Sequence, residues 1–284
     1  MITQSHYTQR RLAAIVGGIL GAGAAVLSSN AQILLTDGDA SVNVDPNSQA
    51  GVYDWEVGGI NHLAQQWLWY RVGNTAEASI DTLALSAITP TGTKQVQLDY
   101  SGAGFDLEVN YSLTGGPAGS GVSDIAEQFT IVNTSESALD FHLFLYSDFN
   151  LAGTAPDDTV TSVNWSPFPF SAPGYNSVVQ VDGDNLQQTT FGTFPKRAEA
   201  EVAPLTLGKL NDGAATDLLN TGAGFGPTGT NDMTYAFQWD LTIAAGSSKV
   251  IGVDKRLDVV IPEPTTAALG LLALAALFQV RRRS

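Results

Sequence analysis

Alternation of apolar and polar residues is the feature that most limits what this chain can fold into. From Phe105 to Leu113 every odd position is apolar and every even position is polar, and 235–243 follows nearly the same pattern. A period of two places successive side chains on opposite faces of a strand, whereas a helix needs a period near 3.6. Both segments therefore predict half-buried antiparallel strands.

Shorter segments of strand composition lie between turns rich in Gly, Asn, Asp and Ser. We expect further strands at 33–36, 41–44, 52–55, 66–72, 95–100 and 177–181. A turn-rich stretch joins 128–132 to 139–149, and we expect these two strands to form a hairpin. Residues 244–248 are predicted to form the turn between the strands 235–243 and 249–253. One short helix is expected within 205–219. Many short strands and few helices predict an all-β antiparallel sandwich of Ig-like or jelly-roll type.

The N-terminus has the composition of a secretory signal peptide. Arg10 and Arg11 precede an apolar stretch to Leu27, and Ser29-Asn30-Ala31 supplies the small residues that signal peptidase requires. We expect cleavage after Ala31, so that the mature chain begins at Gln32. General secretion is favoured over twin-arginine export, which the arginine pair also suggests. An uncleaved N-terminal anchor is the remaining alternative.

The C-terminus carries three signals in a fixed order. Pro262-Glu263-Pro264 is followed by an apolar run to Val280 and then by Arg281, Arg282 and Arg283. The apolar run would form a helix of about 24 Å at ~1.5 Å per residue, slightly shorter than a bilayer core of about 30 Å. The arginines favour a cytoplasmic C-terminus. The prolines cannot continue a helix from the preceding segment, so they separate the tail from the folded body.

This order resembles the PEP-CTERM sorting signal of exported bacterial proteins, and an ordinary C-terminal anchor is the alternative. The resemblance covers only residues 261–284. It implies that an exosortase, a membrane-embedded protease, recognises the tail, cuts near the tripeptide and releases the protein. We therefore divide the chain into a signal peptide (1–31), a β-sandwich body (32–260) and a sorting segment (261–284). We expect transient insertion in the inner membrane and a final location at the cell surface or outside the cell.

The body is strongly acidic and contains no cysteine. The chain has 13 basic and 28 acidic residues; five arginines and one glutamate lie in the two ends, which leaves the body at a net charge of −19. Such a body repels nucleic acid and anionic lipid, and it attracts cations or basic partners. The lack of cysteine excludes disulfides, thiolate metal sites and cysteine nucleophiles. Stability must therefore come from the core.

No catalytic motif is present in the body. It has no Gly-x-Ser-x-Gly elbow, no His-Glu-x-x-His helix and no phosphate loop. Of its two histidines, His142 lies in a strand beside aromatic residues and His62 lies next to a turn, so both are predicted to be structural. Glu108 and Asp148 are possible members of a glycosidase carboxylate pair, a role that needs a separation the sequence does not define. We predict no enzymatic activity and no obligatory cofactor.

Three acidic turns offer oxygen ligands that Ca²⁺ prefers: Asp37-Gly38-Asp39, Asp157-Asp158 and Asp182-Gly183-Asp184-Asn185. None has the spacing of an EF-hand loop. The Asp-Gly pair is also a common hairpin turn, because it tolerates positive φ. Plain turns are therefore the favoured interpretation, and a Ca²⁺ site is the alternative.

The segment Trp67-Leu68-Trp69-Tyr70-Arg71 has large side chains on both faces. Burial in a core is the favoured fate of Trp67 and Trp69, and a platform for sugar rings is the alternative. Trp165 lies in a proline-rich loop at 165–175 and is a third candidate for such a platform. The sequence thus predicts a structural or adhesive protein of an exopolysaccharide matrix. The alternatives are a carbohydrate-binding module and, third, a polysaccharide-active hydrolase.

Replacing Glu263 by alanine tests the sorting signal. Insertion should be unaffected, because the hydrophobicity of the apolar run drives it. Processing should be lost, because the tripeptide is what a protease would recognise. Mass spectrometry of the C-terminus in membrane and medium fractions measures both. Equal processing of the wild type and Glu263→Ala, or a mature protein that still carries Arg281–Arg283, would favour a plain anchor.

Overall fold

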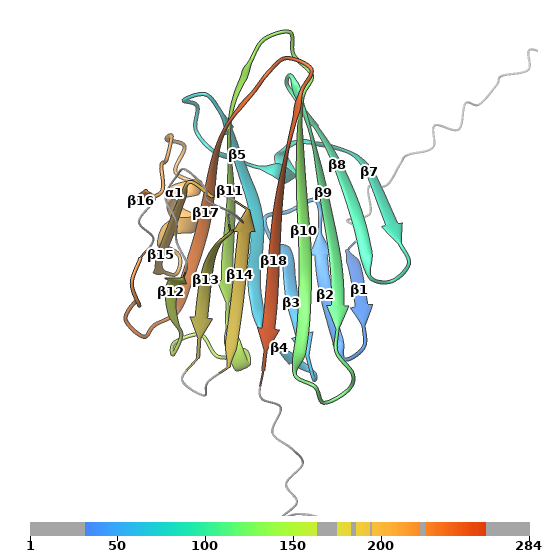
Figure 1. Ribbon diagram of the computed structural model, residues 1–284, viewed down its shortest axis with the longest axis vertical. Helices are drawn as coiled ribbons and strands as arrows, with labels where there is room; N and C mark the ends of the chain where they lie inside the picture. The colour runs from blue at the N-terminus through green and yellow to red at the C-terminus, as the bar shows by residue number, and fades with distance from the viewer. Residues whose placement is uncertain (1–31, 164–174, 183–185, 194, 222–224, 260–284) are drawn as a thin grey trace, which may run out of the picture.

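Two β-sheets packed face to face form the body in a computed structural model of the protein (Figure 1). The structure describes residues 32–163, 175–182, 186–193, 195–221 and 225–259. The predicted signal peptide, the sorting tail and Trp165 lie outside these residues. The prediction of an all-β sandwich of antiparallel sheets is confirmed for the described part.

The first sheet has ten strands. Its main path, in spatial order, is β1 (Ile33–Asp37), β2 (Ala40–Asp45), β3 (Gly51–Val57), β5 (Leu63–Val72), β11 (Leu139–Phe149), β17 (Met233–Ile243), β15 (Arg197–Val202) and β16 (Asn220–Thr221). Two short strands pair outside this path, β4 (Ile60–Asn61) with β3 and β6 (Ala78–Ser79) with β5. The contact of β3 with β5 is parallel and brief, and the other pairings are antiparallel.

The second sheet has eight strands and is antiparallel throughout. Its spatial order is β12 (Thr159–Val163), β13 (Tyr175–Val181), β14 (Gln187–Thr193), β18 (Ser248–Asp258), β10 (Val122–Asn133), β9 (Phe105–Gly115), β8 (Gln95–Gly102) and β7 (Ala84–Thr91). β18 thus lies inside this sheet, with β10 on one side and β14 on the other.

Helices are few, as the sequence predicted. The α-helix α1 (Leu205–Leu210) falls within the stretch expected to hold one, and two single 3₁₀ turns, η1 (Ile80–Thr82) and η2 (Leu151–Gly153), complete the set among the described residues. No helix in the described ranges is long and apolar enough to cross a membrane. The apolar tail predicted to do so lies beyond Val259.

The predicted strands are all present, but the predicted hairpin of 128–132 with 139–149 is wrong. β10 pairs with β9 and β18, whereas β11 pairs with β5 and β17, so residues 134–138 carry the chain from one sheet to the other. The turn after β17 does the same, because β18 belongs to the second sheet. Five residues are enough to cross the ~10 Å between packed sheets, so loop length did not distinguish a hairpin from a crossing.

Aromatic rings fill the space between the sheets. The ring of Phe105 in the second sheet lies 5.0 Å from that of Phe141 and 5.3 Å from that of Tyr70, both in the first sheet. Farther along, Phe149 stacks on Tyr235 with centroids 6.3 Å apart. The Phe149–Tyr235 contact joins neighbouring strands of the first sheet, whereas the Phe105 contacts cross between the sheets and help hold them together without disulfides.

Gly51 is required where β3 meets β5, and its replacement by alanine should destabilise the fold. Its φ is +57°, and a Cβ there would lie 2.2 Å from the Trp67 ring and 2.3 Å from the Gln66 carbonyl oxygen. Gly59 also has a positive φ of +79°, but nothing lies within 4 Å of its Cβ position.

We expect Gly51→Ala to cost about 2–4 kcal/mol, since it adds overpacking to backbone strain, and Gly59→Ala only about 1 kcal/mol from strain. Chemical denaturation of both variants measures the difference. Equal losses would show that the contact with Trp67 is unimportant.

Candidate functional site

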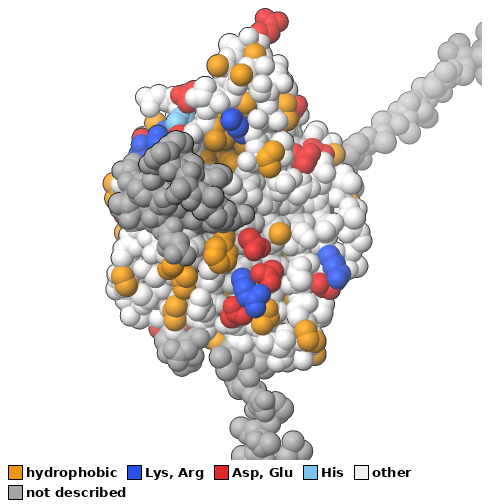
Figure 2. Space-filling view, viewed as in Figure 1, with side chains coloured by type: hydrophobic (Ala, Val, Ile, Leu, Met, Phe, Trp, Pro, Cys, Tyr) orange, Lys and Arg blue, Asp and Glu red, His pale blue; other side chains and the backbone are white. Residues whose placement is uncertain are grey.

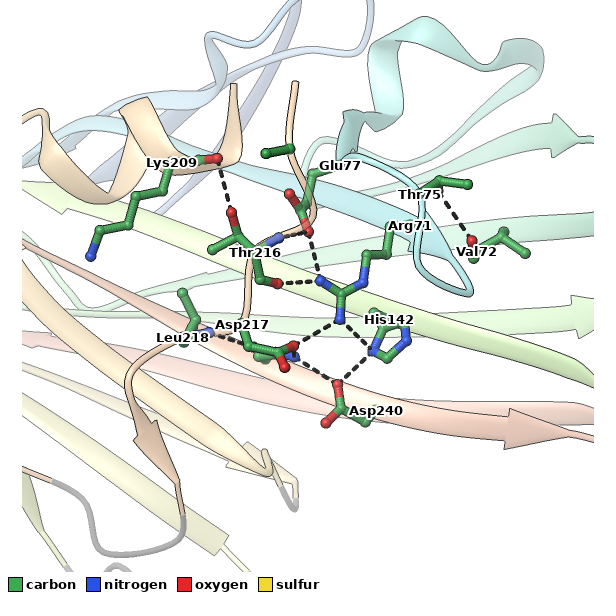
Figure 3. A network of polar contacts seen from close by, with 12 residues as sticks. Arg71, Val72, Thr75, Glu77, His142, Lys209, Thr216, Asp217, Leu218 and Asp240 are labelled. Atoms are coloured by element: carbon green, nitrogen blue, oxygen red, sulfur yellow. Dashed lines mark hydrogen bonds and ion pairs between the residues drawn. The ribbon is translucent and has the colours of Figure 1, made fainter. Parts of the chain in front are cut away.

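Three neighbouring strands place a cation, an imidazole and a carboxylate in one row on the outer face of the first sheet. In strand register, Arg71 of β5 and Asp240 of β17 each lie opposite His142 of β11. Because side chains alternate along each strand, all three point away from the core. Figure 3 shows them converging.

His142 is held by a carboxylate on one side and reaches the surface on the other. Its Nδ1 lies 2.7 Å from Asp240 Oδ1, and its Nε2 lies 3.5 Å from Oδ1 of the exposed Asp140. The imidazole is 13% exposed. In the tautomer with the proton on Nδ1, His142 donates to Asp240 and keeps Nε2 as an acceptor. Such a histidine can bind a hydroxyl or take a proton from one.

Arg71 is fixed from several directions. Its guanidinium donates to Glu77 Oε1 at 3.0 Å, to Asp217 Oδ1 at 2.7 Å and to the Thr216 carbonyl oxygen. It also lies over the Phe144 ring, 5.7 Å from the centroid. Charge-assisted bonds of this number leave the side chain little rotational freedom. Arg71, whose side chain is only 5% exposed, is therefore a rigid and largely buried positive charge beside His142.

A second set of donors holds two carboxylates, that of Asp240 in the row and that of Asp217 beside it. Gln238 Nε2 donates to Asp217 Oδ1 at 2.9 Å and to Asp240 Oδ1 at 2.7 Å. Lys196 Nζ lies 2.9 Å from Asp240 Oδ2, and an Arg197 guanidinium nitrogen lies 3.1 Å from Asp217 Oδ2. Both carboxylates are thus oriented by at least two donors each.

These donors keep the carboxylates ionised. Burial works to raise the pKa of Asp240, but hydrogen bonds from His142 and Lys196 outweigh it and hold the pKa below its usual range. Burial likewise opposes ionisation of Asp217, and the hydrogen bond from Arg71 contributes most to lowering its pKa. At neutral pH the site therefore combines fixed negative and positive charges, a pattern suited to ligands that both donate and accept hydrogen bonds.

Solvent reaches the row from one side. Lys196 and Asp217 are 58% and 46% exposed, while Asp240 is 14% exposed. In Figure 2, basic, acidic and histidine side chains gather near the upper left edge of the molecule. The residues after α1 cover the other side, where Asn211 Oδ1 accepts from Trp69 Nε1 at 3.1 Å.

The tryptophans of β5 do not form an exposed platform. Trp67 and Trp69 lie on the same outer face as Arg71, but each is 0% exposed. The Trp67 indole donates to Asp81 in η1 at 3.1 Å, as the Trp69 indole does to Asn211. They are buried because η1 and the segment after α1 cover them, so a sugar ring could reach them only after that cover moved. Trp165, the third candidate, lies outside the described residues.

His62 and the first acidic turn both have partners within the protein. His62 is 1% exposed and its Nδ1 accepts from the Ala152 backbone N–H at 3.1 Å; burial lowers the pKa of this imidazole to about 4. Asp37 pairs with Lys94 at 2.7 Å, and Asp39 Oδ2 accepts from the Gly119 N–H at 3.0 Å. These groups already have protein partners.

Asp158 of the second acidic turn lies near Asp182, the first residue of the third, whereas residues 183–185 of that turn lie outside the described residues. Gln180 Nε2 donates to Asp158 Oδ2 at 2.6 Å, and both side chains are 0% exposed. Burial raises the pKa of the Asp158 carboxyl to about 8, and repulsion by Asp182 and Asp157 adds to the shift. Within the described residues, no three His, Asp or Glu side chains are arranged to hold a metal ion. Glu108 and Asp148, the tentative carboxylate pair, lie in different sheets, on β9 and β11.

Similarity to known proteins is found in structure and not in sequence. No family model matches the chain, and no curated protein matches it. The fold is similar to a bacterial glucoamylase complexed with acarbose (TM-score 0.56, 9% identity, 87% of this chain and 35% of that one). It is also similar to the Slr1438 protein of Synechocystis sp. PCC 6803 (TM-score 0.52, 12% identity, 82% and 97%) and to a GalM/aldose epimerase homologue of C. elegans (TM-score 0.50, 7% identity, 81% and 100%). The chain therefore spans about a third of the length of the glucoamylase and essentially the whole length of the other two. At these sequence identities, the similarity shows a shared fold and nothing further.

The exclusion of enzymatic activity from the sequence was wrong. The glucoamylase and the aldose epimerase homologue, enzymes by their names, have the same fold. The exclusion rested on the absence of short motifs, and the Arg71–His142–Asp240 row comes from three distant segments that no short motif spans. Lack of a local motif therefore says nothing against catalysis on this scaffold.

Replacing Asp158 by asparagine should flatten the pH dependence of stability. The folded state favours the protonated carboxyl, with a pKa of about 8 against about 3.9 when unfolded. Its contribution to the free energy of unfolding is thus complete below about pH 4. As the pH rises toward 8, the free energy of unfolding falls by on the order of a few kcal/mol. Urea unfolding of the wild type and Asp158→Asn at pH 5 to 9 measures this, with Asp157→Asn as a neighbouring control. A pH profile unchanged by Asp158→Asn would contradict the assignment.

Proposed function

We propose that the body recognises carbohydrate through the outer face of the first sheet, around His142. The observation that carries this proposal is the row of Arg71, His142 and Asp240 across three adjacent strands. Sugar hydroxyls donate and accept hydrogen bonds, and charged groups make the stronger of such bonds. A rigid row with both donors and acceptors, partly open to solvent, matches that chemistry.

The shared fold supports carbohydrate over other ligand classes. One similar structure is a glucoamylase solved with acarbose, and another is a GalM/aldose epimerase homologue. Both names refer to sugars or sugar analogues. Fold likeness alone is an analogy, so the argument rests on the row, and the fold supports the choice of ligand class.

The sequence signals support a location of this activity outside the cell. A signal peptide ending at Ala31 and a PEP-CTERM tail around Glu263 would export the protein and release it by an exosortase. The ligand is then a polysaccharide of the cell surface or the extracellular matrix. The acidic body suits a neutral or basic glycan better than an anionic one, because like charges repel.

Acid–base chemistry on the bound sugar is the second candidate function. His142 is oriented by Asp240 at 2.7 Å, an arrangement in which a histidine can move a proton to or from a sugar hydroxyl. The aldose epimerase homologue makes interconversion of aldose forms the first reaction to examine.

Substitution of His142 tests the binding site. We expect His142→Ala and Asp240→Asn to weaken binding on a glycan array, and by calorimetry with the best glycan, by at least about tenfold, since each removes an oriented polar partner. Glu108→Gln, in the second sheet, is the matched control and should bind as the wild type does. Binding that survives both site variants would place the ligand elsewhere. NMR of anomeric exchange in the same samples separates binding alone from catalysis.

A further inference from the structure

An amine, a carboxylate and an amide meet in the interior between the two sheets. Lys255 of β18 and Glu127 of β10 come from the second sheet, and Gln66 of β5 comes from the first. Lys255 and Gln66 are 0% exposed and Glu127 is 3% exposed. The candidate site on the outer face uses none of them.

Each of the three groups touches the other two. Lys255 Nζ lies 2.5 Å from Gln66 Oε1 and 2.9 Å from Glu127 Oε1. Gln66 Nε2 donates to the same Glu127 oxygen at 2.9 Å. The amide carbon of Gln66 is one bond, about 1.2 Å, from the oxygen that Lys255 contacts. The amine is therefore next to an amide carbonyl, and one carboxylate oxygen contacts both nitrogens.

Burial favours the neutral forms of the charged pair. Desolvation lowers the pKa of Lys255 and raises the pKa of Glu127, against their mutual attraction. Moving one proton from Nζ to Glu127 removes both charges from the interior and leaves Nζ with a free electron pair. Tyr111, whose buried hydroxyl has no hydrogen-bond partner among the described residues, belongs to the same interior.

We propose that Lys255 and Gln66 become joined by an intramolecular isopeptide bond, with Glu127 as the catalytic proton carrier. Glu127 takes a proton from Nζ, and the Nζ electron pair attacks the Gln66 amide carbon, forming the C–N bond. Glu127 then delivers that proton to Nε2, the old C–N bond breaks and ammonia leaves. Glu127, again a carboxylate, takes the second proton that Nζ must lose to become an amide nitrogen, and it ends protonated. One amide replaces another, so no oxidant, reductant or cofactor is needed.

The fold supplies what this reaction requires. Preorganised neighbours convert a slow bimolecular aminolysis into an intramolecular step, and the dry interior keeps water from hydrolysing the product. The bond would tie β5 of the first sheet to β18 of the second, 189 positions apart in the chain. A chain without cysteine cannot form the disulfide that commonly serves this purpose in exported proteins.

Peptide mapping of the purified mature protein tests the bond directly. Trypsin cuts after Lys249 and Arg256, and after Lys255 only if its amine is free. After denaturation and digestion, we expect residues 250–256 joined to the peptide that contains Gln66 and ends at Arg71. The mass of the joined product should be about 17 Da below the sum of the masses of the two separate peptides, because one ammonia is lost.

Variants assign the roles. Lys255→Met should have the intact mass calculated from its sequence, with no loss of ammonia. Glu127→Gln should lower the fraction of joined peptide at least about tenfold, because it impairs proton transfer and keeps the shape of the side chain. Lys94→Met removes an exposed lysine and should leave the joined peptide intact.

The wild-type measurement alone decides the proposal, whatever the variants do to folding. A free peptide 250–255 as the dominant product, with an intact mass that shows no loss of ammonia, would overturn it. Full cross-linking in Glu127→Gln would overturn the role of Glu127.

Discussion

The register of β11 between β5 and β17 is the constraint on which both halves of this structure depend. Because the side-chain period is two, one alignment of three strands sends Phe141 into the core and His142 to the outer face. A slip of one residue would exchange the two faces: it would bury the imidazole and expose the phenylalanine. The aromatic contacts between the sheets thus hold the polar row in place, and the stability of the core determines the precision of the site.

Charge is used in two different ways in this acidic chain. On the outer face, Asp217 and Asp240 each have several donors, remain ionised and are partly exposed. In the interior, Lys255 and Glu127 have one another and Gln66, in surroundings where full charges are costly. The first arrangement suits reversible contact with a ligand from solvent, and the second makes the neutral, reactive forms of its groups accessible. The same sheet framework therefore provides two chemically distinct environments.

The strands could be predicted from the sequence because alternation is a local signal. Residues 105–113 and 235–243 lie in β9 and β17, and the short helix falls where expected. The strand order could not be predicted, since a five-residue connection serves a hairpin and a sheet crossing equally well. For the same reason the site was missed. His142 and Asp240 both lie in predicted strands, but nothing local shows that these strands are neighbours. The burial of Trp69 depends on a cover supplied by Asn211, 142 positions away in the chain.

The position of β18 has a mechanical consequence. It is the last strand before the apolar tail, yet it lies inside the second sheet, hydrogen-bonded along its length to β10 and along one half to β14. Pulling on the C-terminal end of the body would load many of these bonds together, because a strand with neighbours on both sides cannot peel off as an edge strand does. A protein held to a surface through its tail would thus meet tension where the sheet resists it best.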